Sequence, residues 1–139
     1  MKQDKIEFQK LGVDESRYGE VIYNLYAVVR KDRCEVKEEI DKLDDTMIDE
    51  IISIASFMAT VENYKSKKLK WTLKKYSYGE LRPEGHRVFF FRKCGKNIIF
   101  FGYHEKKKDS ILDELYERLE KEKQIYEKEF EQFHKKLSG

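Results

Sequence analysis

The spacing of apolar side chains divides the first half of the chain into one strand followed by two helices. Residues 20–31 are rich in β-branched and aromatic side chains, and apolar residues occupy both alternating sets of positions. This pattern predicts a strand that is buried on both faces. The spacing then changes to that of a helix with one apolar face. We therefore expect two helices, over about residues 35–43 and 46–62, with Asp44 or Asp45 capping the second.

Three short apolar segments follow at the spacing of consecutive hairpins. Pro83 and Gly85 mark the first connection as a turn, and a short glycine-containing turn forms the second. The segments predict an antiparallel meander that joins the first strand in one sheet, and they cover residues 76–82, 87–93 and 98–104. Before them, residues 64–75 carry apolar side chains at alternate positions among lysines, which fits either the start of a strand or a tightly packed loop.

A long helix without a breaker is predicted from residue 110 to residue 137, with Asp109 and Ser110 offering its cap. It carries an apolar stripe with a repeat of seven, made by Leu112, Leu119, Tyr126 and Phe133. Such a helix is about 40 Å long, more than a small sheet needs as cover. We expect its first half to pack on its own domain and its second half to meet either the N-terminal extension or a second chain.

These elements predict an α+β fold with an N-terminal strand, two helices, a three-strand meander and a long C-terminal helix. The chain then divides into an N-terminal extension at 1–19, with a short strand or helix in it, a core at 20–108 and a helix at 109–139. A length of 139 residues suits a single domain.

The charge is distributed unevenly along the chain. The formal net charge is only +2, but residues 64–108 hold 14 basic and 3 acidic side chains, whereas the segments on either side are acidic. The same third holds 10 of the aromatic residues. Basic and aromatic side chains interleaved on a sheet suit RNA, although the rings equally fit an ordinary core. The basic third therefore predicts a polyanion partner.

Other classes of protein receive no support from the sequence. No apolar run approaches the roughly 20 residues of a transmembrane helix, and the N-terminus lacks the apolar core of a signal peptide. Cys34 and Cys94 have no pairing or metal-binding spacing, and we expect them to be reduced thiols in a cytoplasmic protein. Neither a metal nor a cofactor is expected, since the histidines are scattered and no phosphate-binding glycine loop occurs.

Two arginines are the first candidates for a site. Arg82 ends one meander strand and Arg87 begins the next, so a turn brings them close enough to bind one phosphate. The structural alternative is pairing with a local carboxylate, for which Glu80, Glu84 and Glu105 are the nearby choices; the excess of cations favours an external anion. Alternation along the strand places Arg92 on the opposite face from Arg87.

His104 is the candidate for proton transfer, because it ends the last strand and an unperturbed imidazole titrates near neutrality. The alternative is an exposed histidine at the end of a strand. We interpret His86 and His134 as structural.

Residues 67–108 resemble the RelE/ParE superfamily of toxins from toxin–antitoxin systems, and are most similar to its HigB-like, phage-derived branch. The resemblance is carried by Glu80-Leu81-Arg82, a glycine turn, Arg87 before an aromatic strand, a second apolar strand and then Lys106-Lys107. It extends with less detail over about residues 20–120, and the order of a strand, two helices and a meander is also the family's order.

The resemblance implies a ribosome-associated endoribonuclease, or mRNA interferase, that causes growth arrest and is held silent by a cognate antitoxin. In the family's metal-free mechanism the ribose 2′-OH attacks the adjacent phosphate, so the site needs clustered cations and a group that titrates near neutrality. The matching catalytic candidates are Arg87, Arg82, His104 and Lys107. Two alternatives stay open: Arg82 either takes part in catalysis or orders the sheet, and a lysine whose pKa is lowered by neighbouring cations could replace His104 as the base. The RNA-binding candidates are Lys68, Lys70, Lys74, Lys75, Lys106 and Tyr103, and Tyr103 is also an alternative for the proton transfer.

Tyr78 and Glu80 stand where RelE carries a lysine pair, and the long C-terminal helix replaces a short family C-terminus. These departures keep two alternatives open. One is a ParE-like inhibitor of DNA gyrase, which needs no catalytic residues. The other is a non-toxic nucleic-acid-binding relative that dimerises through the C-terminal helix.

Overall fold

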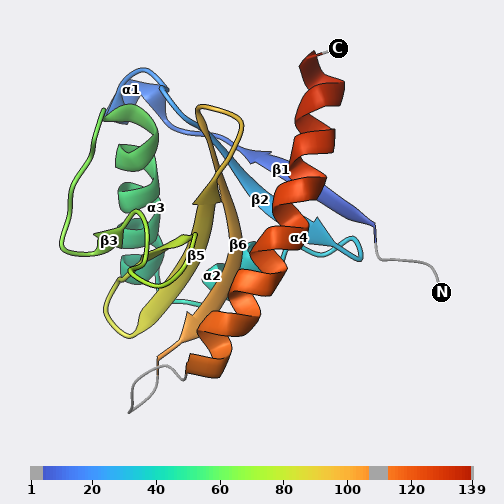
Figure 1. Ribbon diagram of the computed structural model, residues 1–139. Helices are drawn as coiled ribbons and strands as arrows, with labels where there is room; N and C mark the ends of the chain where they lie inside the picture. The colour runs from blue at the N-terminus through green and yellow to red at the C-terminus, as the bar shows by residue number, and fades with distance from the viewer. Residues whose placement is uncertain (1–4, 107–112, 139) are drawn as a thin grey trace.

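The computed structural model describes residues 5–106 and 113–138, which form a mixed six-stranded sheet between helices (Figure 1). Figure 1 shows α3 on one side of the sheet and α4 running across the other. The elements in chain order are β1 Ile6–Leu11, α1 Glu15–Tyr18, β2 Asn24–Arg30, α2 Glu35–Asp41, α3 Asp45–Thr60, β3 Leu69–Lys70, β4 Gly79–Leu81, β5 His86–Arg92, β6 Asn97–Glu105 and α4 Asp113–Ser138.

The strands lie in the order β1-β2-β6-β5-β4-β3. The β4–β5–β6 meander is antiparallel and joins β2 through a parallel β2–β6 pair, as the sequence predicted for one sheet. The sheet nevertheless has two strands more than the four predicted. β1 comes from the N-terminal extension and pairs antiparallel with β2, while β3 adds two residues of the basic 64–75 segment to the opposite edge. β1 has a single buried side chain, Phe8, which packs on Phe130 of α4, and its sequence pattern is accordingly weak.

The helices α2 and α3 cover one face of the sheet with aliphatic side chains. Ile54 and Met58 of α3 are buried in one cluster with Val88 and Phe90 of β5. Asp44 is the cap of α3, because its carboxylate accepts a hydrogen bond from the backbone N–H of Met47 at 2.8 Å. The helices observed, α2 and α3, agree with those predicted to within a few residues at each end.

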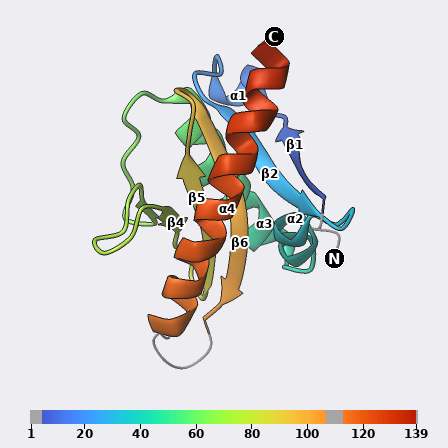
Figure 2. The same cartoon turned by 45° about the vertical axis from the view of Figure 1, so that its right-hand side comes forward.

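The single helix α4 crosses the other face, as the rotated view makes clear (Figure 2). Its apolar stripe buries Leu119, Tyr126 and Phe130. The ring of Phe130 meets Phe8 of β1 edge-on, with 5.0 Å between the ring centroids. Of the two partners expected for the second half of this helix, the structure therefore shows the N-terminal extension. The predicted cap, Asp109 and Ser110, and the stripe residue Leu112 lie outside the described residues.

A β-bulge sets the register of β5 against β6. Phe89 pairs with Gly102 and Phe90 with Phe100, so Phe101 is an extra residue on β6. A side chain at Gly102 would come within 3.1 Å of Leu119, so glycine lets α4 approach the sheet. Beyond the bulge, Arg87 lies directly opposite His104. Within the described residues, no helix has both the length and the apolar character needed to cross a membrane.

Candidate functional site

Arg82 and Arg87 meet at a single carboxylate on the α4 face of the sheet. Glu80 lies in β4 opposite Phe89, and its side chain is fully buried. Its Oε2 accepts a hydrogen bond from Nε of Arg82 and lies 3.5 Å from Nε of Arg87. The prediction that the turn brings the two arginines together is confirmed. Both arginines pair with a local carboxylate, Glu80, which is the structural alternative to an external anion. We call Glu80, Arg82, Arg87 and Tyr116 the arginine cluster.

The helix α4 contributes the fourth member of the arginine cluster. The phenol of Tyr116 donates a hydrogen bond to Oε1 of Glu80 at 3.1 Å, and the Tyr116 carbonyl accepts one from the Tyr78 hydroxyl at 2.8 Å. Burial, together with the nearby Glu80 carboxylate, raises the pKa of Tyr116 to about 12. Tyr116 therefore remains protonated near neutral pH and acts as a hydrogen-bond donor to the carboxylate.

The arginine cluster carries an excess of positive charge that solvent can reach. Two guanidiniums share the carboxylate of Glu80, which leaves one positive charge in excess. The Arg87 side chain is 15% exposed, and its Nη1 also donates to the carbonyl of His86 at 2.7 Å. The Arg82 side chain is 35% exposed and has N–H groups beyond the one that bonds Glu80. An anion in solution can therefore approach Arg82 directly, while Arg87 is more deeply buried and is held by Glu80 and by the His86 carbonyl.

The two proton-transfer candidates lie on opposite faces of the sheet. His104 is half-buried and pairs across the strands with Arg87, so the two side chains share the α4 face. Tyr103 faces the other way and belongs to the cluster under α3. Its hydroxyl forms a hydrogen bond of 2.6 Å with Nδ1 of His86. The structure therefore places His104, and not Tyr103, beside the arginine cluster.

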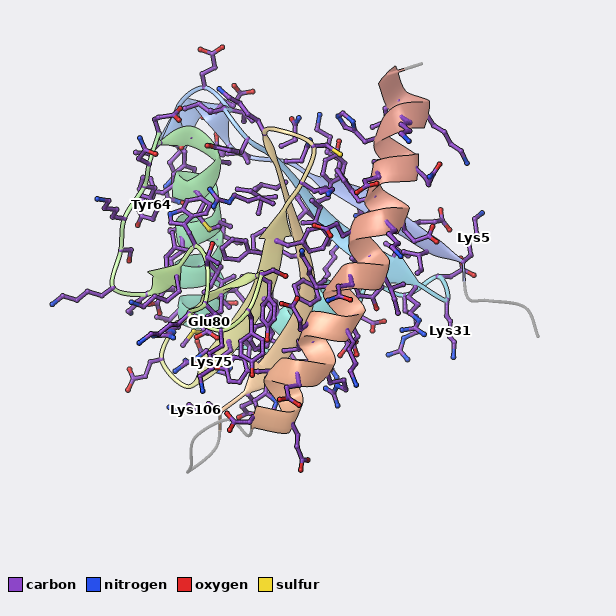
Figure 3. All side chains as sticks on the ribbon, in the orientation of Figure 1. Lys5, Lys31, Tyr64, Lys75, Glu80 and Lys106 are labelled. Carbon is purple, nitrogen blue, oxygen red and sulfur yellow. The ribbon has the colours of Figure 1, made fainter. Side chains whose placement is uncertain are left out.

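The lysine candidates are spread over several surfaces. Lys68 is ion-paired with Glu50 of α3, on the side of the sheet away from α4. The backbone N–H of Lys106 donates to the Gly85 carbonyl at 2.9 Å, which fixes the end of β6 beside the β4–β5 turn. Figure 3 shows Lys75, Glu80 and Lys106 toward the same, lower end of the molecule. Lys70 and Lys74 are exposed, and Lys107 lies outside the described residues.

Most rings of the basic third belong to the core rather than to a binding surface. The phenylalanines of β5 and β6 are all buried, as is Tyr78. Tyr64, Trp71, Tyr76 and Tyr103 are only partly buried. Tyr76 stacks on Tyr116, with 5.7 Å between the ring centroids. Of the two interpretations of these aromatic residues, the structure supports the core for the larger group.

Acidic side chains at the start of α4 lie beside Tyr76 and Ser77, just before β4. Glu120 accepts hydrogen bonds from the backbone N–H of Ser77 at 2.7 Å and from its hydroxyl. Burial raises the pKa of Tyr76, and Glu117, Asp113 and Glu120 raise it further. The first turns of α4 thus offset part of the positive potential that the meander produces.

Two members of the arginine cluster were not identified as functional residues from the sequence. Glu80 is one of several nearby carboxylates in the sequence, although a glutamate within a short apolar strand that is followed by two arginines is itself a signal of a buried ion pair. Tyr116 precedes Leu119 by three residues, and this spacing places the two side chains on the same face of the helix.

Comparison of the chain with protein-family models, with curated proteins and with solved structures finds no match. Within residues 5–106 and 113–138, no group of three or more histidine, cysteine or acidic side chains is arranged to hold a metal ion.

Proposed function

We propose that this chain is a toxin of the RelE/ParE type, an endoribonuclease that cleaves mRNA at the arginine cluster. The observation that carries the proposal is the sharing of one buried carboxylate by two guanidiniums, with His104 opposite Arg87. This arrangement provides fixed positive charge and a titratable group on one face, which is what attack of a ribose 2′-OH on its phosphate requires.

Each residue of the cluster has a separate role in this proposal. Arg82, the more exposed guanidinium, binds a phosphate oxygen, and Arg87 stabilises the charge that develops on the phosphorane. His104 transfers a proton at the 2′-oxygen or at the leaving 5′-oxygen. Glu80 and Tyr116 are positioning residues, because they fix the guanidiniums through hydrogen bonds and an ion pair.

The order of the elements supports the same proposal. A strand, two helices and an antiparallel meander occur in the chain in the order that the resemblance implies. Under this proposal the chain has a cognate antitoxin and acts on ribosome-bound mRNA in the cytoplasm. A homodimer through α4 also remains a prediction. The apolar stripe of this helix packs on β1 and β2 of its own chain, so a second copy would have to meet another side of the helix.

Arg87→Ala tests the proposal directly. Inducible expression of the wild-type chain should arrest growth, and primer extension should map new 5′ ends in cellular mRNA. Arg87→Ala should reduce cleavage by at least about 100-fold, since removing one group that stabilises transition-state charge costs about that much. Arg118→Ala is the matched control, because Arg118 is an exposed arginine of α4 outside the arginine cluster. Undiminished cleavage by a folded Arg87→Ala variant would disprove the assignment.

A ParE-like inhibitor of DNA gyrase is the second candidate, and one observation favours it. Both arginines are already paired with Glu80, as in a purely structural ion pair. Plasmid supercoiling and translation, measured after induction, separate the two functions: loss of supercoiling with intact mRNA indicates the gyrase inhibitor. Induction without a growth defect would instead favour the non-toxic nucleic-acid-binding relative.

A further inference from the structure

A second candidate site lies on the α3 side of the sheet, away from the arginine cluster. It is a pocket of about 220 Å³ lined by Tyr23, Asn63, Tyr64, Lys65, Trp71 and Arg92. We call it the aromatic pocket. Figure 3 shows Tyr64 at the upper left, beside α3, and Glu80 well below it. A pocket of this size has room for one planar heterocycle but not for a helix.

The rings of the aromatic pocket are held in fixed orientations by neighbouring rings and by one hydrogen bond. The indole Nε1 of Trp71 donates to the Tyr64 carbonyl at 2.7 Å, and the Trp71 ring meets Phe90 edge-on at a centroid distance of 5.8 Å. Tyr64 stacks on Phe57 of α3 with 5.4 Å between the centroids. Tyr23 lies 6.4 Å from Trp71. These contacts reduce the ordering cost that a stacked ligand would have to overcome.

The charge of the aromatic pocket selects against a cation and in favour of an anion. The guanidinium of Arg92 lies over Trp71, 4.9 Å from the ring centroid, and Lys65 adds a second positive charge. None of the six lining residues has a carboxylate. The positive charges of Arg92 and Lys65 would repel an ammonium ligand of the kind that aromatic cages bind. A planar group that carries or adjoins a negative charge fits instead.

A nucleobase with its adjoining phosphate has this chemistry. Bases of single strands stack on aromatic rings and on arginine planes, and they form hydrogen bonds through exposed edges. Trp71 and Tyr64 offer rings, Arg92 offers both a plane and a positive charge, and the Asn63 amide offers a donor and an acceptor. Lys65 is exposed at the rim, where a phosphate next to the base would lie.

We infer that the aromatic pocket binds one base of a single-stranded RNA, as a contact separate from the arginine cluster. Arg87 and Arg92 belong to the same strand but face opposite sides of the sheet, about 17 Å apart along it at 3.3 Å per residue. An RNA strand that reaches both sites would pass round the edge of the sheet at β3, where Lys70 is exposed. The inference rests on the proposed RNA substrate but does not require cleavage.

Trp71 provides a direct measurement, because it is the only tryptophan of the chain. The probe is an uncleavable 2′-O-methyl hexanucleotide added to the full chain while tryptophan fluorescence is recorded. Stacking of a base on the indole should quench the fluorescence, whereas inorganic polyphosphate of matched charge should not. Equal quenching by polyphosphate would overturn the inference, since only charge would then be recognised. Quenching by AMP but not by the hexanucleotide would overturn the assignment to RNA.

Variants at the rim test the same point without disturbing the core. Arg92→Ala should weaken hexanucleotide binding roughly tenfold, and Arg92→Lys should restore little of it, because lysine keeps the charge but lacks the plane. Asn63→Asp should also weaken binding, by repelling the phosphate. Lys10→Ala, at an exposed position on the far edge strand, is the control. Wild-type affinity in both Arg92 variants would overturn the inference.

Arg87→Ala distinguishes failure of this inference from failure of the proposed function. The variant should lose cleavage and still show quenching of Trp71. Quenching by a wild-type chain that does not cleave RNA would support the aromatic pocket and count against the nuclease. Cleavage without quenching would leave the nuclease and overturn the pocket.

Discussion

The two faces of the sheet are covered in different ways. On one face, α2 and α3 bring aliphatic side chains onto β5 and β6, and the buried polar residue of these helices is Ser56. On the other face, α4 buries phenols and charges, among them Tyr126 and Lys123. The ammonium group of Lys123 is held by Glu127 at 2.8 Å and lies over the ring of Phe91.

The difference follows from the sequences of the helices and determines where chemistry can occur. α3 is apolar over much of its surface, so it covers its face mainly with aliphatic side chains. α4 is mostly charged and covers its face along a narrow stripe. Beside that stripe, Glu80 and two arginines find room to form a polar cluster. The face with the incomplete apolar cover therefore carries the candidate catalytic residues.

Phe130→Ala should produce the largest loss of stability on the α4 face. Phe130 is fully buried against Phe8 and Tyr26, so its truncation should cost about 3–5 kcal/mol in the free energy of unfolding. Met58→Ala, at a fully buried position of the other face, should cost about 2–5 kcal/mol. Urea titration monitored by circular dichroism gives both values.

Ile125→Ala is the control for Phe130→Ala, because Ile125 lies on the exposed side of the same helix. Its cost should remain within about 0.5 kcal/mol. A similar small cost for Phe130→Ala would show that α4 contributes little to folding. The α4 face would then not be a well-packed core comparable to the face under α3.

Glu80→Gln should have the next largest effect. The substitution removes the negative charge that the two guanidiniums share. It should lower the free energy of unfolding by about 2–3 kcal/mol. This is less than the ~3–5 kcal/mol expected for a fully buried pair, because Arg82 can turn toward solvent. Glu84→Gln, at an exposed position in the adjoining turn, should be nearly neutral. Thermal unfolding of both variants measures the difference. A stable Glu80→Gln variant would mean that the arginines do not depend on this carboxylate for their positions.

Much of the fold could be predicted because its central elements have strong local patterns. The strand at 24–30, the helices α2 and α3 and the meander all repeat apolar positions with a clear period. The edge strands β1 and β3 could not be predicted in this way. β1 buries one side chain, and the two residues of β3 are too few to show a period.

The candidate site was only partly predictable, for a related reason. The proximity of Arg82 and Arg87 follows from a turn between adjacent strands, which is local information. The contact of Tyr116 with Glu80 joins residues 36 positions apart and depends on how α4 lies across the sheet. Which of His104 and Tyr103 faces the arginine cluster depends on the alternation of side chains along β6 and on the bulge at Phe89 and Phe90.

Glu122→Gln should give the smallest effect and the sharpest test of the charged α4 face. Burial raises the pKa of the Glu122 carboxyl and Glu35 adds to the rise, although Arg118 and Arg30 lower it. A carboxyl whose pKa is higher in the folded state holds its proton more tightly there. The stabilisation that the protonated carboxyl contributes is therefore fully present below its pKa in the unfolded chain. It is lost as pH rises through its pKa in the folded state.

At neutral pH the charged Glu122 should accordingly destabilise the fold, and Glu122→Gln should be slightly more stable than the wild type. The gain should disappear in acid, where the wild-type carboxyl is protonated. Urea titrations at several pH values measure this crossover, with Glu129→Gln at an exposed position of α4 as the control. A Glu122→Gln variant that is less stable at neutral pH would show that the ion pair with Arg118 outweighs the cost of burial. In that case, α4 would tolerate the charge of Glu122 at the margin of the core because Arg118 pairs with it.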